Sequence, residues 1–177
     1  RQMCIRDRIR YVKREILKGP KKMKYSIQFS DAIHIIAYIE IYKGTDVLSS
    51  EMIARSVETN PANVRKIMSQ LKKSGLIITQ VGKPNPTLAK RPEEITLLDI
   101  YKSIEGNTNL IQVDPKTNPD CIVGANIQDV LNEKYDELQK KVEEEMNGIT
   151  LDSLVHKIAK LEIEKRPENE PVLKNFL

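Results

Sequence analysis

The sequence predicts a mainly α-helical chain with one small β-hairpin, and three observations lead to this prediction. Apolar residues recur three and four positions apart along most of the 177 residues, as they do on one face of a helix. A short β-rich run, Leu76–Gly82, is followed by the turn-forming sequence KPNP. A stretch rich in Asn and Pro, residues 107–120, separates several short helical patterns from one long one.

Composition narrows the class of protein. A chain of 177 residues can form one domain or two small ones around a hydrophobic core. Two cysteines cannot build a disulfide framework, which fits a reducing compartment. The sequence contains no run of about 18 apolar residues and no signal-peptide core. We therefore expect a cytoplasmic protein without a membrane partner.

The net charge of +4 is unevenly distributed along the chain. Residues 1–22 hold nine Lys or Arg against two Asp or Glu, and residues 23–91 hold ten against five. Residues 92–177 hold ten against eighteen. A basic first half and an acidic second half indicate two tasks, one of which faces a polyanion.

Residues 1–22 form a leader that we expect to be non-native or disordered. The leader begins with RQMCIRDR, which lacks a starting Met and resembles translated sequencing-adapter sequence. A coherent helical pattern begins only at Met23. The alternative is a basic arm that binds DNA.

The first predicted helix is apolar on two sides. Ser30 is its expected N-cap, and it ends near Lys43 and Gly44. A helix with two apolar stripes must be covered twice, which leaves room for a partner subunit on the second side. The stripes are Ala32, Ile35, Ile36 and Ile39 on one side, and Ile33, Ala37 and Ile41 on the other.

Two shorter helices and a hairpin follow. Ser49 caps the second helix, and Asn60 caps the third, where Pro61 occupies the favoured first position. A strand within Leu76–Gly82, a KPNP turn and a TLAK return strand form the predicted hairpin. Thr96 then begins a fourth helix that stops at Gly106, because Thr96 and Asp99 have capping-box spacing. This order is typical of a winged helix-turn-helix, which we assign to residues 23–106.

Residues 107–164 are predicted to form a dimerisation region with one long helix. The helical pattern resumes at Cys121 and shows one apolar stripe opposite a charged face. The remaining elements are too few to cover this stripe, so we expect it to pair with its copy in a homodimer. Thr150 caps a last helix, and the polar, Pro-containing residues 165–177 are expected to be mobile. The stripe consists of Val123, Ile127, Val130, Leu131, Tyr135, Leu138 and Val142.

The third helix is the candidate DNA reader. Its apolar face packs inward, so its polar and basic side chains, including Ser69, should point outward and reach base edges in a major groove. The alternative is a solvated face on an ordinary helix. The basic residues of the wing can reach a minor groove or the backbone, or they can be ordinary loop charges. The predicted contacts are Ser49, Asn60, Ala62, Asn63, Arg65, Lys66, Gln70, Lys73, Lys83, Lys90 and Arg91.

Nothing in the sequence points to an enzyme or a metal site. His34 and His156 lie in different predicted helices, and neither is near Cys121 in sequence. No Gly-rich phosphate loop and no cluster with metal-ligand spacing occurs. We predict no catalytic residue and no cofactor.

The stretch SSEMIARSVETNPANVRKIMSQLKKSGLI, followed by GKPNPTLAKRPEEITLLDIYKSIE, resembles the Rrf-two family of bacterial regulators, which includes IscR, NsrR and CymR. PEEITLLDIY is the most specific piece, and NPDCIVG narrows the resemblance to the YwnA-like branch. The resemblance implies a homodimeric winged-helix transcription factor, usually a repressor. It also implies DNA contacts on the third helix, the start of the second helix and the wing.

Two features depart from the family. Its wings usually carry a Gly-Gly pair, where this chain reads GKPNPT, so the groove contacts of the wing are in doubt. Its iron–sulphur members hold their cluster with three closely spaced cysteines, where this chain has Cys121 alone. We therefore predict no iron–sulphur cluster.

Cys121 has two interpretations. A thiol at the start of the long helix can act as a redox sensor, as the resemblance suggests for some members. The other interpretation is a small buried packing residue, which the sequence favours slightly. The predicted function is a sequence-specific DNA-binding regulator; the alternative is a winged helix that binds protein and not DNA.

Overall fold

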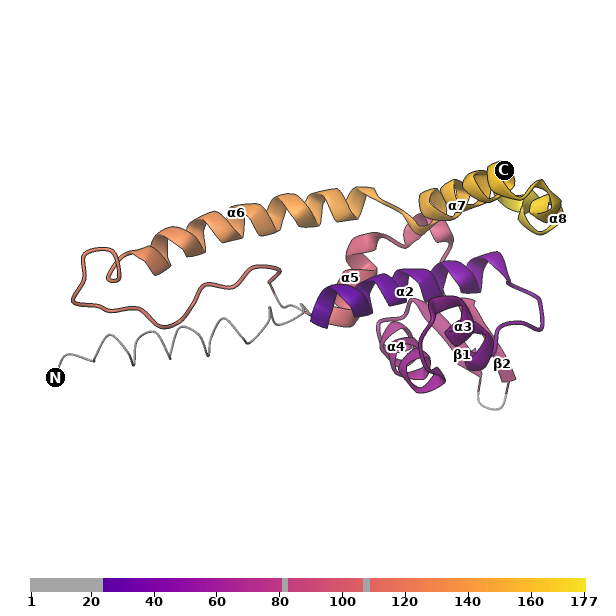
Figure 1. Ribbon diagram of the computed structural model, residues 1–177, viewed down its shortest axis with the longest axis horizontal. Helices are drawn as coiled ribbons and strands as arrows, with labels where there is room; N and C mark the ends of the chain where they lie inside the picture. The colour runs from indigo at the N-terminus through magenta and orange to yellow at the C-terminus, as the bar shows by residue number, and fades with distance from the viewer. Residues whose placement is uncertain (1–23, 81–82, 107–108) are drawn as a thin grey trace, which may run out of the picture.

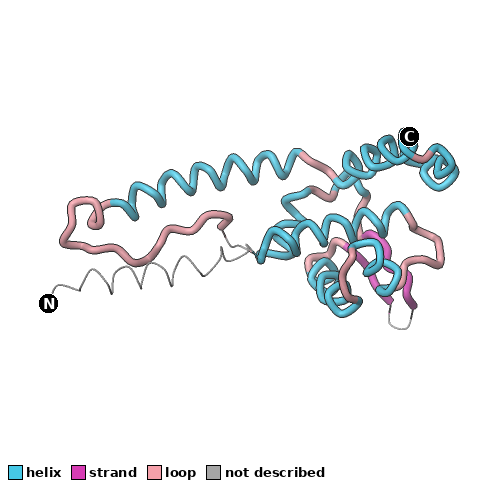
Figure 2. Tube along the Cα trace, in the orientation of Figure 1, coloured by secondary structure: helices cyan, strands magenta, loops and turns pink. Residues whose placement is uncertain are grey.

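The computed structural model describes residues 24–80, 83–106 and 109–177. The leader, residues 1–22, lies outside this range. Most of the described chain is helical and one two-stranded sheet is present, as predicted (Figures 1 and 2). The elements are α2 (Lys24–Ile41), α3 (Ser50–Val57), α4 (Pro61–Lys73), β1 (Ile77–Gln80), β2 (Lys83–Leu88), η1 (Pro92–Glu94), α5 (Leu97–Glu105), α6 (Ile127–Gly148), α7 (Leu151–Lys165), η2 (Pro167–Asn169), α8 (Glu170–Leu173) and η3 (Lys174–Phe176).

Helices α2 to α5 and the hairpin form a winged helix-turn-helix. Helices α3 and α4 and the hairpin lie together on one side of α2 (Figure 1). Strand β1 pairs antiparallel with β2. The last pair in the register, Gln80 with Lys83, stands on either side of residues 81–82. The KPNP segment is therefore part of β2, and its prediction as a turn was wrong. Residues 81–82, which join the two strands in sequence, lie outside the described range.

Local capping explains where most helices begin. The side chains of Ser49, Asn60 and Thr150 each accept a hydrogen bond from a backbone N–H in the first turn of α3, α4 and α7. Thr96 and Asp99 form the predicted capping box at the start of α5, with bonds of 3.1 and 3.2 Å. A Ser, Thr or Asn cap stabilises a helix by about 1 kcal/mol relative to Ala.

Helix α2 begins at Lys24, so the prediction of Ser30 as its N-cap was wrong. The added N-terminal turns carry Phe29, whose ring packs edge-on against Tyr101 of α5 at a centroid distance of 5.6 Å. This aromatic contact joins α2 to α5 and favours the continuation of the helix.

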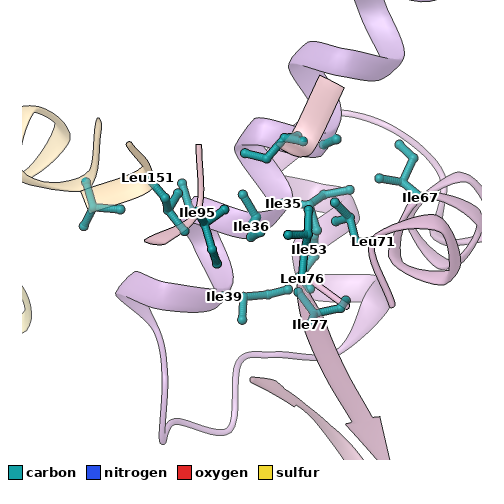
Figure 3. Packing of buried hydrophobic residues seen from close by; sticks show 14 of the residues in the cluster. Ile35, Ile36, Ile39, Ile53, Ile67, Leu71, Leu76, Ile77, Ile95 and Leu151 are labelled. Carbon is teal, nitrogen blue, oxygen red and sulfur yellow. The ribbon is translucent and has the colours of Figure 1, made fainter. Parts of the chain in front are cut away.

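The core is assembled around α2 (Figure 3). Ile35, Ile36 and Ile39 are fully buried, as the first stripe predicted. They belong to one cluster with residues from α3, α4, the hairpin, α5 and α7. The labelled partners in the figure are Ile53, Ile67, Leu71, Leu76, Ile77, Ile95 and Leu151.

Helix α7 is fastened to the winged helix by backbone pairing. The N–H of Leu97 donates to the carbonyl of Ile149 at 2.9 Å, and the N–H of Leu151 donates to Ile95 at 2.8 Å. This short β-bridge lies between α6 and α7, so α7 lies against α2 while α6 extends away from the body (Figure 1). The second stripe of α2 therefore faces α7 and the tail of its own chain, where the sequence left room for a partner subunit.

The tail also differs from its prediction. Residues 167–176 form two short 3₁₀ turns and α8, and Leu173 and Phe176 join the core cluster. The ring of Phe176 lies edge-on to the ring of His156. The Nζ of Lys43 lies 5.7 Å from the centroid of the Phe176 ring. The expectation of a mobile segment at 165–177 was wrong because two apolar side chains, far from their contacts in sequence, anchor it.

The long helix starts six residues later than expected, at Ile127. A turn precedes it, because the N–H of Cys121 donates to Asn118 and the N–H of Ala125 donates to Cys121. Gly124 lies so close to Asn118 that a Cβ there would overlap the Asn118 carbonyl. Among the described helices, none is long and apolar enough to cross a membrane.

Candidate nucleic-acid interface

A groove with both polar and apolar lining lies between the start of α3, the outer face of α4 and the hairpin. Arg65 and Lys72 place two cationic side chains in it. These residues lie on the same face of α4, two helical turns apart. The remaining polar groups are hydroxyls and one amide, which can donate to or accept from phosphates and base edges. The lining residues are Leu48, Ser50, Arg65, Met68, Ser69, Lys72, Thr79, Gln80 and Pro86.

The outer face of α4 presents several of the predicted contacts to solvent. Ala62, Arg65, Lys66 and Lys73 are exposed, while Val64, Ile67 and Leu71 face the core. This division follows the 3.6-residue period of the helix, which is why the sequence predicted it. Within the described residues Lys66 forms no ion pair, so its exposed ammonium group is available to a polyanion.

Arg65 is held in place by α3. Its Nη1 donates to the Oγ of Ser50 at 2.9 Å and to the Oε1 of Glu51 at 3.3 Å. Both side chains of the ion pair are more than half exposed, at 59% and 61%, so the pair contributes little to stability. Its effect is to orient the guanidinium over the groove and to join the two helices of the helix-turn-helix.

The Glu51 carboxylate is stabilised in its charged form. Its own backbone N–H, the Ser50 hydroxyl and Arg65 together lower its pKa, with the backbone hydrogen bond as the largest cause. A carboxylate at the start of α3 is also favoured by the helix dipole. Arg65 therefore stays paired with Glu51 unless a stronger anionic partner takes the place of the Glu51 carboxylate.

Two predicted base readers do not point outward. The Nδ2 of Asn63 donates to Asp31 of α2 at 3.3 Å and to the hydroxyl of Thr59 at 3.2 Å. The Nε2 of Gln70 donates to the carbonyl of Ile104 in α5 at 3.4 Å. Both side chains are half-buried and connect α4 to neighbouring helices. The prediction that they face solvent was wrong, because helical spacing alone cannot tell the edge of a face from its centre.

Ser49 and Asn60 are used as caps. The Ser49 hydroxyl accepts from the N–H of Met52 at 3.2 Å, and the Asn60 side chain accepts from the N–H of Asn63 at 2.8 Å. The cap of Ser49 places it at the N-terminus of α3, next to Ser50 in the groove. Both side chains therefore contribute to the interface by fixing where α3 and α4 begin.

The predicted wing contacts lie at different places on the hairpin. Lys83 starts β2 beside residues 81–82. Lys90 and Arg91 follow the other end of β2, away from the turn. The backbone N–H and the guanidinium of Arg91 both donate to Glu94. The guanidinium bond and the charge of this carboxylate raise the pKa of Arg91. The wing residues therefore do not form one cationic tip.

Several groove residues were missed by sequence reasoning. Ser50, Thr79 and Gln80 come from α3 and β1, and they meet α4 only after the chain has folded. A partial signal was present on α4, where Arg65, Ser69 and Lys72 are spaced i, i+4 and i+7.

Cys121 is exposed, so the packing interpretation was wrong for the chain on its own. It lies in the turn before α6, and this end of α6 is the one remote from the winged helix (Figure 1). The backbone N–H groups of Gly124 and Val123 donate to the thiol and lower its pKa. The thiolate is therefore more populated than that of an ordinary cysteine.

The comparisons with known proteins agree on one family. Residues 25–157 match the Rrf2 family, described as "Iron-dependent Transcriptional regulator". The chain is 37% identical over 125 residues to YwnA of Bacillus subtilis strain 168, described as an HTH-type transcriptional regulator. The aligned part covers 71% of this chain and 92% of YwnA. These proteins are regulators and not enzymes, as the sequence predicted.

Two solved structures have a similar fold. A crystal structure described as that of a DNA-binding protein is 35% identical, with a TM-score of 0.58, over 72% of this chain and 97% of that chain. CymR, the global cysteine regulator of B. subtilis, shares the fold with 20% identity and a TM-score of 0.55, over 72% of this chain and 92% of CymR.

The residues present do not fit an iron–sulphur cluster, although the family description mentions iron. Such clusters are held by several thiolates, whereas the described ranges contain a single cysteine, Cys121. Within those ranges, no three His, Cys, Asp or Glu side chains gather in a way that would hold a metal ion.

Proposed function

Because the chain belongs to the Rrf2 family of transcriptional regulators, we propose that it is a homodimeric repressor that binds a specific operator through α4. The observation that supports this most strongly is the groove beside α4, with the cationic side chains of Arg65, Lys66 and Lys72 on or next to it. A regulator of this kind acts where the DNA is, which in a bacterium is the cytoplasm.

The outer face of α4 supplies the reading groups. The N-terminal part of a recognition helix enters the major groove, where Arg and Lys pair with guanine O6 and N7. We assign this role to Arg65 and Lys66, while Ala62 allows close approach. Asn63 and Gln70 are assigned to support of α4, since both donate to neighbouring elements.

Phosphate contacts come from the flanks of this face. Ser49 and Ser50 lie at the N-terminus of α3, where backbone N–H groups and the helix dipole favour an anion. Lys73 at the end of α4 and Lys83 at the hairpin provide further charge. Lys90 and Arg91 lie farther from the turn, so their contribution is expected to be smaller.

Helix α6 is the proposed dimerisation surface. None of its residues is buried within the described chain, and its stripe includes Val130, Leu138 and Val142, which are 54%, 46% and 37% exposed. Pairing with a second α6 would remove this apolar surface from water at roughly 25 cal/mol per Å². A two-fold dimer would present two α4 helices to a near-palindromic operator.

Cys121 is a candidate thiol sensor, which would make the regulator redox-responsive. Its exposure and lowered pKa support reaction with oxidants. The test is mild oxidation of the native protein and of Cys121→Ser, followed by measurement of operator affinity. A sensor predicts that only the native protein changes; equal affinities before and after oxidation in both proteins contradict it.

Binding to duplex DNA as a function of salt tests the proposed function. Each phosphate contact contributes a slope of about −0.9 to the plot of log affinity against log salt. We expect a steep fall in affinity between low and high salt. A flat plot, or no binding at low salt, would favour the alternative of a protein-binding winged helix, for which an apolar α4 face would be more suitable than the basic one observed.

A further inference from the structure

A second cavity lies beside α2, away from the groove next to α4. It has a volume of about 540 Å³, within the range of about 300–1,000 Å³ that small-molecule sites occupy. Its walls come from α2, α3, α7 and the tail. The lining residues are Ser30, Ile33, His34, Ala37, Tyr38, Ile41, Tyr42, Ser56, Ile158, Glu162, Arg166, Asn169, Val172 and Leu173.

The lining combines an apolar surface with polar groups of defined geometry. The apolar part includes Ile33, Ile41 and Ile158. Glu162 is already paired, since it accepts from Arg166 at 2.7 Å and from the Asn169 side chain. Arg166 uses one of its guanidinium N–H groups in this pair and keeps others for a ligand. Such convergence of apolar surface and a few polar groups is typical of a ligand site.

We propose that this cavity binds a small effector with an apolar, aromatic or branched aliphatic body and one hydrogen-bond-accepting end. The body lies against Ile33, Ile41 and Ile158, and the accepting end faces Arg166. The Glu162 carboxylate orients the guanidinium of Arg166, which balances its charge, and it also accepts a hydrogen bond from Asn169.

Six of the fourteen lining residues lie outside the part of the chain that matches the family. The match ends at residue 157, whereas Ile158, Glu162, Arg166 and Val172 follow it. The buried Leu173 and Phe176 fix this last segment against the body. The family match therefore does not account for this part of the lining.

The cavity is in contact with the DNA-reading helices. The ring of His34 forms a 2.9 Å hydrogen bond with the Ser56 hydroxyl of α3, and both residues line the cavity. Helix α3 holds Arg65 through Ser50 and Glu51. A ligand that disturbs the contact between His34 and Ser56 would shift α3 and the groove. This coupling, unlike binding itself, rests on the proposed function.

Calorimetric titration of the full chain with 8-anilinonaphthalene-1-sulfonate tests binding. This probe has an aromatic body and one accepting sulfonate. Ile158→Trp fills the cavity, and Leu161→Trp is a matched control on the same helix, because the two residues are 43% and 42% exposed and only Ile158 lines the cavity. We expect saturable binding that Ile158→Trp weakens about tenfold or more, and that Leu161→Trp leaves unchanged. Circular dichroism establishes that both variants fold.

The polar end is tested by a second pair of variants. Arg166→Gln should weaken binding of the probe several-fold, whereas Lys165→Gln, its neighbour outside the cavity lining, should not. Equal binding by Ile158→Trp and Leu161→Trp would overturn the proposal. Absence of saturable binding by the native chain, as when a second copy covers the cavity, would also overturn it.

The coupling has its own readout. Saturating probe should change the affinity of the native chain for duplex DNA, and should leave that of Ile158→Trp unchanged. If the native chain binds the probe and DNA independently, the cavity remains a ligand site without control of the groove. If it binds the probe but no DNA, the proposed function fails and the ligand site stands.

Discussion

The winged-helix body and the α6 arm differ in how they are stabilised. The body buries apolar residues from α2, α3, α4, the hairpin, α5 and α7 in one cluster, whereas α6 contributes no buried residue to it. Helix α6 contacts the body through partly exposed side chains, as in the ion pair of Lys102 with Glu143 at 3.3 Å. The body can therefore fold on its own contacts, while the arm requires apolar surface that the described chain does not supply.

The two regions also differ in charge. The outer face of α4 is basic, with Arg65, Lys66 and Lys73, while the polar face of α6 carries a majority of acidic residues. The body is therefore suited to a polyanion and the arm is not. A single chain can in this way keep DNA on one surface and subunit pairing on another.

A core substitution should have the largest effect. Ile67→Ala removes a fully buried side chain and should lower the free energy of unfolding by about 2–5 kcal/mol. Val130→Ala on α6 should act only through dimerisation, so its effect should vanish on dilution. Urea denaturation at several protein concentrations separates the two. A concentration-independent loss for Val130→Ala would mean that the arm is stabilised within its own chain.

A charge in the α6 stripe should dissociate the proposed dimer. Leu138→Glu places a carboxylate in apolar surface that pairing would bury, and should weaken dimerisation by about tenfold or more, which corresponds to about 1.4 kcal/mol. Asp136→Lys, on the polar face of α6, is the control. Sedimentation velocity gives the dissociation constants. If the native chain is monomeric, or both variants dimerise like it, α6 is not the interface.

Asn63→Ala distinguishes support from base reading. Loss of its hydrogen bonds to Asp31 and Thr59 should cost about 1 kcal/mol of stability. DNA affinity should change little below the unfolding temperature. Lys66→Ala should show the reverse pattern. Thermal unfolding and anisotropy titrations measure both, and a large loss of affinity with unchanged stability for Asn63→Ala would restore it as a base reader.

Cys121 gives the smallest effect, on reaction rate alone. Hydrogen bonds from Gly124 and Val123 lower its pKa, so the thiolate forms at a lower pH than in an ordinary cysteine, for which the pKa is about 8.5. The rate of alkylation by iodoacetamide should rise with pH to a midpoint below that of free glutathione measured alongside. A midpoint at or above that of glutathione would remove the chemical basis for a sensor.

Local signals in the sequence predicted much of the fold. Ser49, Asn60, Thr96 and Thr150 each cap the helix that they were expected to cap, because a cap depends on a few neighbouring residues. The apolar period of α2 likewise identified Ile35 and its neighbours as core. Both kinds of signal depend on short-range geometry.

Long-range contacts explain where the predictions failed. Ser30 is an acceptable cap, but packing of Phe29 on Tyr101 of α5 outweighs that preference. Phe176 and Leu173 order the tail through contacts with distant elements. Asn63 has polar neighbours on α2 that helical spacing does not reveal. The candidate groove was predicted only in part for the same reason, since Ser50 and Gln80 come from elements other than α4.

The central claim is that the basic face of α4, and not the net charge of the chain, binds DNA. Arg65→Ala with Lys66→Ala removes two positive charges from this face, and Lys140→Ala with Lys141→Ala removes two from α6. Anisotropy titrations of duplex DNA against salt compare these double variants with the native chain. The α4 variant should bind more weakly, with a log–log slope shallower by about 1–2, and the α6 variant should match the native chain. Equal losses in the two variants, or no loss in the α4 variant, would contradict the claim.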